Sequence, residues 1–359
     1  MNIRKTILLG LLLLALPMFG KNQYTDALEL TVVGKFLPTA HPWDRMDPVE
    51  GMTKGELKQA RQCSGLAVAF RTDSRGIGVR VVWRQAGTGG NIGLISLRGF
   101  DLYIKQDGRW LWAGNGYPQK DDTPGVPHEV MFLKDCIEGV KECLVYLPTY
   151  SEIDSLEIVT DASSLIEPAP YPFKGRIAVF GSSYTQGSGA GRCAMIWTSQ
   201  LARATGYNFI NLGFSGNCKL QPYFAEALAK AEDVDAYLFD GFSNPNATLI
   251  RERLEPFIRI FKEKRPGIPL IFLQTLHREK RNFSTGTENF EKAKQEAADE
   301  MMKQMVEKYE DVYWITTTNA TSPLHETTAD GSHPDAYGYT LWMESVKDPV
   351  VEILSKYKL

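Results

Sequence analysis

The sequence has little of what marks several common protein classes. It carries five cysteines and five histidines in 359 residues, and they do not form the closely spaced pairs of a metal site. Its 40 basic and 43 acidic residues give a net charge of −3, and no basic run is present. We therefore expect chemistry without a metal or other cofactor, and no binding of nucleic acid.

Long apolar runs are lacking too, except near the N-terminus. There Arg4 and Lys5 precede an apolar stretch from Ile7 to Leu16, which Pro17 ends. An N-terminal membrane anchor is the alternative, but this stretch is about half of the ~20 residues that a spanning helix needs. Residues 1–20 are therefore predicted to be a signal peptide, which implies a periplasmic or secreted protein with no membrane span after cleavage.

The few cysteines leave one question open. Cys136 and Cys143 flank a short loop, and they either form a hairpin disulfide in an oxidising compartment or remain separate thiols. The odd total leaves at least one thiol free. Cys63, Cys193 and Cys218 are interpreted as small buried apolar side chains.

Residues 24–170 have the pattern of a β-rich domain. Apolar residues alternate with others around residues 77–82, and residues 102–112 form a predicted hairpin with Asp107-Gly108 at its turn. Short strands without long helical patterns predict a β-sandwich. Three prolines between residues 168 and 172 mark the end of this domain.

Residues 174–359 have a different pattern, in which apolar strands alternate with amphipathic helices. This alternation predicts a three-layer α/β/α domain with a parallel sheet, whose ligands bind at the carboxyl ends of the strands. The predicted strands are 176–180, 207–212, 235–240, 268–274 and 312–316, and the predicted helices are 192–205, 221–231, 247–264, 287–309 and 334–357.

Two segments at these strand ends predict a serine hydrolase site. Ser183 lies in a Gly-rich turn, Gly181 to Gly187, directly after the first strand. Asp330 precedes His333 by three residues, a spacing that lets the carboxylate accept the imidazole Nδ1–H and leaves Nε2 free to take a proton from a serine. Ser182 is the alternative nucleophile. Ser183 also fits a helix N-cap, and His333 fits the start of the last helix.

The second and third strands end in residues that can stabilise an oxyanion. Gly216 follows the second strand in a loop where a backbone N–H can approach a ligand closely. Asn244 follows the third strand and carries a side-chain amide donor. With the backbone N–H of Ser183, these groups make three candidate donors for one oxyanion.

The four segments, in this order, resemble the SGNH (GDSL-like) hydrolase superfamily over residues 174–359. The resemblance implies Ser183 as nucleophile, His333 as base and Asp330 as its partner, with Ser183, Gly216 and Asn244 forming the oxyanion hole. Two positions depart from the common pattern, because Gly-Ser-Ser replaces Gly-Asp-Ser and Asn244 is followed by proline.

A second resemblance lies upstream of these segments. Residues 99–103, Gly-Phe-Asp-Leu-Tyr, are similar to the Gly-x-Asp-Leu-Tyr signature of the β-rich domain that precedes such hydrolases in bacterial esterases. The signature falls within residues 24–170, where that two-domain arrangement would place it.

These features predict an exported serine esterase that acts on small-molecule or glycan esters. The family resemblance, together with an exported β-rich domain, implies acetyl esters of a carbohydrate. A lipase, thioesterase or phospholipid acyl-hydrolase would use the same residues. A carbohydrate-binding protein without activity is the alternative from another class. Trp83, Trp110 and Trp112 fit either a sugar-binding surface or the core of the β-sandwich, and we expect the core.

Overall fold

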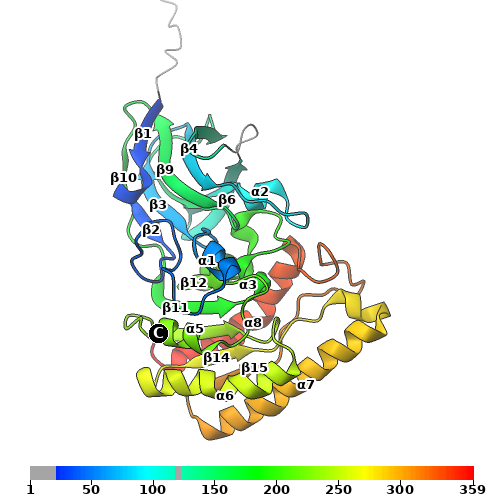
Figure 1. Cartoon of the computed structure of the whole chain (residues 1–359). Coiled ribbons are helices and arrows are strands. Elements are labelled where there is room, and N and C mark those ends of the chain that lie inside the picture. Colours follow the sequence, from blue (N-terminus) through cyan, green and yellow to red (C-terminus); the bar gives the residue numbers. More distant parts are fainter. Residues whose placement is uncertain (1–21, 118–122) are drawn as a thin grey trace, which may run out of the picture.

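The computed structural model describes residues 22–117 and 123–359 (Figure 1). The predicted signal peptide, residues 1–20, lies outside the described residues. A β-rich part and an α/β part are stacked on each other, with the last helix in the α/β part (Figure 1). No helix in the described ranges is both long enough and apolar enough to cross a membrane.

The β-rich part consists of two antiparallel sheets that enclose one core. The first has the order β1-β9-β4-β7, and the second has the order β10-β3-β8-β5-β6, with β2 paired to β3. The predicted β-sandwich is confirmed, because side chains from both sheets, including Val68, Val79 and Trp83, are buried in the same cluster. The strands are β1 (Asn22–Asp26), β2 (Thr31–Val33), β3 (Ala67–Thr72), β4 (Ile77–Gln85), β5 (Phe100–Gln106), β6 (Arg109–Gly116), β7 (Pro127–Leu133), β8 (Lys141–Tyr146), β9 (Glu152–Asp161) and β10 (Ile166–Pro168).

The α/β part has one parallel sheet with the order β12-β11-β13-β14-β15. Its strands are β11 (Lys174–Gly181), β12 (Tyr207–Gly213), β13 (Ala236–Asp240), β14 (Leu270–Leu273) and β15 (Val312–Ile315). The helices of the chain are α1 (Lys54–Ala60), α2 (Leu94–Leu97), α3 (Ser183–Gln186), α4 (Trp197–Thr205), α5 (Pro222–Leu228), α6 (Ala247–Lys264), α7 (Thr285–Lys308) and α8 (Ala336–Lys356).

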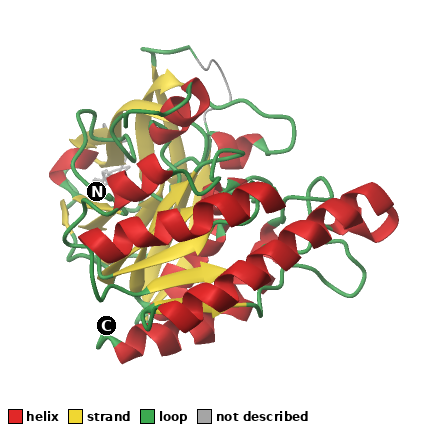
Figure 2. Cartoon of the chain, turned by 60° about the horizontal axis from the view of Figure 1, so that its bottom comes forward, coloured by secondary structure: helices red, strands yellow, loops and turns green. Residues whose placement is uncertain are grey.

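Helices cover both faces of this sheet (Figure 2). Ala178 and Phe180 of β11 are buried with residues of α5, α6 and α7. Ile177 and Val179, which alternate with them, are buried with residues of α4 and α8 on the other face. This alternation follows from the two-residue repeat of a strand, and it confirms the predicted α/β/α arrangement.

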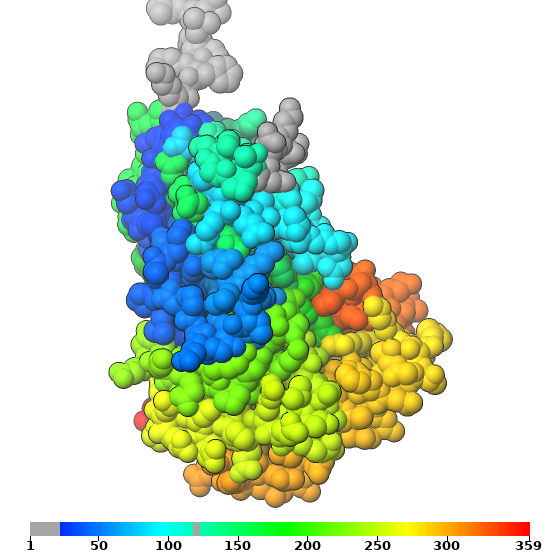
Figure 3. Space-filling view, viewed as in Figure 1, coloured from blue at the N-terminus to red at the C-terminus, as the bar shows by residue number. Residues whose placement is uncertain are grey.

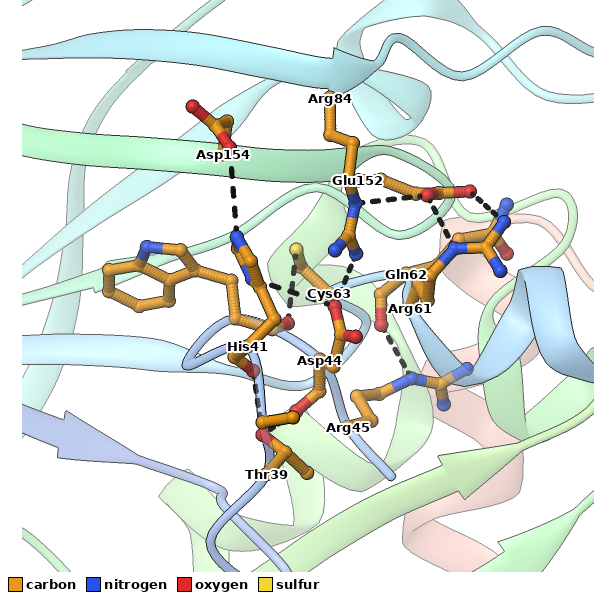
Figure 4. A network of polar contacts seen from close by, with 12 residues as sticks. Thr39, His41, Asp44, Arg45, Arg61, Gln62, Cys63, Arg84, Glu152 and Asp154 are labelled. Carbon is orange, nitrogen blue, oxygen red and sulfur yellow. Dashed lines mark hydrogen bonds and ion pairs between the residues drawn. The ribbon is translucent and has the colours of Figure 1, made fainter. Parts of the chain in front are cut away.

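Arg45 connects the β-rich part to the end of the parallel sheet. Its side chain is 1% exposed, and it donates to the main-chain carbonyl of Gln62 (Figure 4) and to those of Gln59, Asn211 and Gly213. Burial lowers the pKa of this guanidinium to about 10, which leaves it charged at neutral pH. The charge is therefore balanced by four carbonyl dipoles, two of them at the carboxyl end of β12.

An ionic network holds the segment around Arg45 against the β-sandwich (Figure 4). Glu152 of β9 is 2% exposed and accepts from Arg61 at 2.8 Å and from Arg84 at 3.2 Å. Arg84 also pairs with Asp44, the residue before Arg45. The network therefore joins β4 and β9 to the segment that reaches the parallel sheet.

Asp101 of the Gly-x-Asp-Leu-Tyr signature forms a second connection. Its carboxylate is fully buried, and it accepts from Arg192 Nη1 at 3.0 Å and from the N–H of Ala194 at 2.9 Å. These contacts fix a short turn just before α4, which explains why this helix begins at Trp197 and not at the predicted residue 192. Asp101 of the signature therefore binds the β-rich part to the α/β part.

One expectation for the β-rich part was not met. Trp83 is in the core, but Trp112 is 51% exposed and Trp110 is partly exposed. Trp112 pairs with Tyr103, and both tryptophans lie on the face of their sheet that points away from the sandwich core.

The question left open for Cys136 and Cys143 is answered in favour of separate thiols, because all five cysteines are buried free thiols. Burial raises the pKa of Cys143 to about 12.

Candidate active site

The predicted nucleophile lies in a sharp turn between β11 and α3. Ser182 is the N-cap of α3, and its hydroxyl accepts from the N–H of Tyr184 at 3.1 Å. Ser183 is therefore the first helical residue and not the cap. A side chain at Gly181 would meet Thr185 Oγ1 at 2.0 Å, so the tight turn requires glycine there. The turn places the Ser183 hydroxyl at the carboxyl end of the central strands.

The structure brings Ser183, His333 and Asp330 together. Ser183 Oγ lies 3.0 Å from His333 Nε2, although the two residues are 150 positions apart. His333 Nδ1 lies 2.8 Å from Asp330 Oδ2, and Asp330 Oδ1 accepts from the backbone N–H of His333 at 2.9 Å. Such a chain of contacts lets the imidazole take a proton from the serine while the carboxylate holds the ring.

Asp330 remains ionised over a wide range of pH. Burial of the carboxyl opposes ionisation, but the backbone N–H of His333, the side-chain amide of Asn91 and the imidazole of His333 together hold the pKa of Asp330 well below its ordinary value. A carboxylate in this state is suited to stabilising an imidazolium that forms beside it.

The loop that carries Asp330 and His333 is held by Glu279, a residue that no sequence motif indicates. Its carboxylate accepts from the hydroxyls of Thr321, Thr327 and Thr328. The Thr328 hydroxyl in turn accepts from the N–H of Gly331 at 3.0 Å. Glu279 follows β14 by several residues in the sequence, so no local pattern links it to this loop.

The three candidate oxyanion donors lie after adjacent strands. Gly181 of β11 is paired with Gly213 of β12 and with Asp240 of β13, so the segments that follow these three strands begin side by side. Gly216 has a φ of 73° and is exposed. Within the described residues, neither the backbone N–H of Ser183 nor that of Gly216 donates to a protein acceptor.

Asn244 is oriented by the loop that contains Gly216. Its Oδ1 accepts from the N–H of Cys218 at 3.3 Å. With the carbonyl end of the amide held in this way, the NH₂ group is the end left to act as a donor. In the part of the chain that the structure describes, no protein acceptor takes a hydrogen bond from it. The arrangement fits a donor for negative charge that develops during a reaction.

A buried ionic group fixes the residue before Asn244. The Ser243 carbonyl accepts from Arg278 at 2.7 Å and from Lys294 at 3.2 Å. Both cations contact Glu291, and burial lowers the pKa of Lys294 to about 8. Arg278 also donates to the hydroxyl of Tyr184 at 2.8 Å, which connects this group to the nucleophile turn.

The β-rich part also reaches the site. Asn91, in the loop between β4 and α2, donates to Asp330 Oδ2 at 3.0 Å. The cyan segment that includes α2 lies close to the orange-red segment near residue 330 (Figure 3). No motif predicted this contact, because the two residues are 239 positions apart. Groups of His, Cys, Asp and Glu able to hold a metal do not occur in the described residues.

Comparisons with known proteins agree with this architecture. The profile of the GDSL-like lipase/acylhydrolase family matches residues 174–352, and the GxDLY profile, the N-terminus of SGNH-hydrolase-type esterases, matches residues 22–166. A solved structure from Bacteroides ovatus, described as a GDSL-like lipase, has a TM-score of 0.88 and 35% identity, and the match covers 93% of this chain and 98% of that one.

More distant structures share the fold. A salicylyl-acyltransferase from a tetracycline biosynthetic pathway has a TM-score of 0.67 at 18% identity, and the match covers 94% of this chain and 98% of that one. A family two carbohydrate esterase from Cellvibrio japonicus has a TM-score of 0.61 at 11% identity, with 93% and 98% covered. No curated protein matches the sequence significantly.

Both parts of the chain match a family profile, and the Bacteroides ovatus protein is related over nearly the whole length. The chain therefore belongs to the GDSL-like lipase/acylhydrolase family with an N-terminal GxDLY domain, and it is a carboxylic ester hydrolase.

Proposed function

We propose that this protein is an exported serine esterase that removes O-acyl groups, chiefly acetyl, from a carbohydrate. In this proposal Ser183 is the nucleophile, His333 the general base and acid, and Asp330 the group that orients the imidazole. Residues 24–170 form the GxDLY domain and residues 174–359 form the hydrolase domain.

One observation carries the proposal: the two consecutive short contacts of His333. Its Nε2 lies 3.0 Å from Ser183 Oγ and its Nδ1 lies 2.8 Å from Asp330 Oδ2. Both distances are within the range of a hydrogen bond that can transfer or hold a proton. Ser182 is less suited to attack, because its hydroxyl is fully buried and donates to Asp240 at 2.6 Å.

Acylation begins when Ser183 Oγ attacks the ester carbonyl carbon and its proton moves to His333 Nε2. The carbonyl oxygen becomes an oxyanion, which accepts from the backbone N–H groups of Ser183 and Gly216 and from Asn244 Nδ2. When the tetrahedral intermediate breaks down, His333 returns the proton to the departing alkoxide of the sugar. The acyl group remains as an ester on Ser183.

Deacylation repeats these steps with water. His333 takes a proton from the water molecule, and the hydroxide attacks the acyl carbon of the Ser183 ester. The same donors stabilise the second oxyanion, and His333 then protonates Ser183 Oγ as the carboxylic acid leaves. Asp330 remains ionised throughout, so it stabilises the imidazolium in both halves of the reaction.

The substrate class is inferred from the shared fold and from the N-terminal sequence. Carbohydrate esterases of family two share the fold over most of this chain, and one such structure contains cellohexaose. A signal peptide over residues 1–20 agrees with an enzyme that meets polysaccharide outside the cytoplasm. Acetyl esters are therefore proposed ahead of long acyl chains.

The test measures hydrolysis of p-nitrophenyl esters from acetate to palmitate, and acetate release from acetylated oligosaccharides. We expect the highest kcat/KM with acetate, and acetate release that is lost in Ser183→Ala. A preference for long chains would instead favour a lipase or phospholipid acyl-hydrolase. No hydrolysis of any ester by the wild type would indicate a carbohydrate-binding protein.

A further inference from the structure

We propose that Asn91, from the β-rich part of the chain, is a positioning residue for the catalytic His333–Asp330 pair. The inference rests on the proposed function, because it assigns a further partner, from outside its own loop, to the carboxylate that orients His333. Asn91 Nδ2 donates to Asp330 Oδ2 at 3.0 Å, although Asn91 lies in the loop that follows β4. The β-sandwich therefore supplies a group to the active site itself.

The donors around Asp330 define what Asn91 does there. Oδ1 accepts from the backbone N–H groups of Ser332 at 3.0 Å and His333 at 2.9 Å. Oδ2 accepts from the ring of His333 at 2.8 Å and from Asn91 at 3.0 Å. The first three donors belong to the same short loop as the carboxylate. Asn91 is the donor from outside this loop, so it ties the carboxylate to a separate sheet.

Asn91 Nδ2 also lies 3.4 Å from His333 Nδ1. The protonation of this ring nitrogen decides whether Asn91 donates to His333 or to Asp330. When His333 Nδ1 carries the proton that it donates to Asp330, this nitrogen has no free lone pair to accept from Asn91. The Asn91 amide then donates to the carboxylate alone. It also disfavours rotation of the Asp330 carboxylate away from the ring, which would leave His333 in the wrong tautomer.

The loop that carries Asn91 is built to keep its position. Gly87, at the start of the loop, donates its N–H to Ser151 Oγ at 2.9 Å, and its carbonyl accepts from Arg98 at 2.8 Å. A side chain at Gly87 would meet the Tyr150 carbonyl at 2.8 Å, so the loop packs tightly at this point. Ile92, the neighbour of Asn91, is buried. These contacts hold an exposed polar side chain in reach of Asp330.

The test compares Asn91→Ala and Asn91→Asp with the wild type, all as the full chain, with p-nitrophenyl acetate as substrate. Asn91→Ala should lower kcat about 10-fold, which corresponds to about 1.4 kcal/mol of activation free energy, while KM and the melting temperature stay close to the wild type. Asn91→Asp adds a carboxylate that stabilises the protonated imidazole. The acidic limb of its kcat/KM profile should therefore move to higher pH by about half a unit or more.

Thr88 provides the matched controls, because it is exposed on the same loop three residues earlier. Thr88→Ala and Thr88→Asp should keep the wild-type kcat and the wild-type acidic limb. If Thr88→Asp moved the limb as far as Asn91→Asp does, the shift would reflect general charge on the loop, and the proposal would be overturned.

Two other outcomes would overturn it. Wild-type kcat in Asn91→Ala would mean that the Asp330 carboxylate needs no donor from outside its own loop. A loss in Asn91→Ala with an unmoved acidic limb in Asn91→Asp would mean that residue 91 does not act on the His333–Asp330 pair. Ser183→Ala separates these failures from a failure of the proposed function. If Ser183→Ala is inactive, the serine mechanism stands whatever Asn91 does, and if it is active, the mechanism itself is wrong.

Discussion

Ser182, the residue before the proposed nucleophile, donates its hydroxyl to Asp240 of the neighbouring strand β13 at 2.6 Å. The same carboxylate oxygen accepts from the backbone N–H of Ser182 at 3.0 Å and from the Thr185 hydroxyl at 3.1 Å. Its other oxygen accepts from the Ser243 hydroxyl at 2.7 Å. Asp240 therefore joins the turn that carries Ser183 to the segment that carries Asn244.

Replacement of Asp240 by asparagine should weaken both stability and activity. The carboxyl is 2% exposed, and the amide NH₂ that replaces one oxygen cannot accept from the donors now present. We expect a loss of about 2–3 kcal/mol in the free energy of unfolding, measured with urea, together with a lower kcat. Asp235→Asn, at the residue just before the start of the same strand, is the control and should keep kcat. An unchanged free energy of unfolding in Asp240→Asn would contradict this assignment.

Ser183→Ala and Ser182→Ala should have opposite consequences. Loss of a nucleophile of this kind costs several powers of ten in rate, so we expect kcat to fall at least ~1000-fold in Ser183→Ala without loss of stability. Ser182→Ala removes the cap of α3 and a bond to Asp240, and should lower stability by about 1–2 kcal/mol while much of the activity remains. The reverse pattern of activity would assign the nucleophile to Ser182.

Asn244→Ala should lower kcat about 100-fold with little change in KM, because its amide acts chiefly on the oxyanion of the transition state. Asn246→Ala is a matched control from the same loop. Asn246 is the N-cap of α6, so its replacement should cost about 1 kcal/mol of stability and leave kcat unchanged. A rise in KM alone in Asn244→Ala would make this residue a ground-state substrate contact.

Asp330→Asn should be less damaging to kcat than His333→Ala. The ring of His333 transfers the proton, whereas Asp330 holds the ring and stabilises its charge. Four donors surround the Asp330 carboxylate, and several of them can still bind the remaining carbonyl oxygen of asparagine. The check is kcat against pH for both variants on one acetyl ester. Retained activity in His333→Ala with none in Asp330→Asn would mean that a different set of residues performs the reaction.

Asp330 should also contribute to acid sensitivity. Its pKa is held below the ordinary value near 3.9 in the folded protein, against the effect of burial, by His333 N–H, the Asn91 amide and the His333 ring. Below about pH 4 the unfolded chain binds a proton at this carboxyl that the folded protein does not, so this stabilisation is lost as the pH falls.

The comparison that tests this effect is the free energy of unfolding at pH 6 and pH 3. We expect it to fall less between these two values in Asp330→Asn than in the wild type. Asp348→Asn changes an exposed acid on α8 and should behave as the wild type does. Equal losses in the wild type and Asp330→Asn would show that the carboxyl titrates alike in both states.

Much of the fold was predictable because its signals are local. A continuous apolar run, Ile177 to Phe180, predicted β11, and amphipathic spacing predicted α6 with the bounds that the structure has, Ala247–Lys264. Two adjacent residues, Asp107 and Gly108, likewise predicted the turn of the β5–β6 hairpin, and both have a positive φ.

The sequence by itself also determined where Ser183, Gly216 and Asn244 lie. Each follows a strand directly, and parallel strands end at one edge of a sheet, so the order of elements was enough to predict their neighbourhood. The three-residue spacing between Asp330 and His333 is local as well, and it indicated their contact before any fold was known.

Only the tertiary structure decided the partners that hold these residues. Asn91, Asp240 and Glu279 contact the site from separate loops and strands, and no local pattern records a contact between segments that are far apart in the chain. The exposure of Trp112 depended in the same way on which face of its sheet packs against the other sheet of the sandwich. Local residue patterns specify elements and the chemistry at their ends, whereas packing between elements decides which side chains meet there.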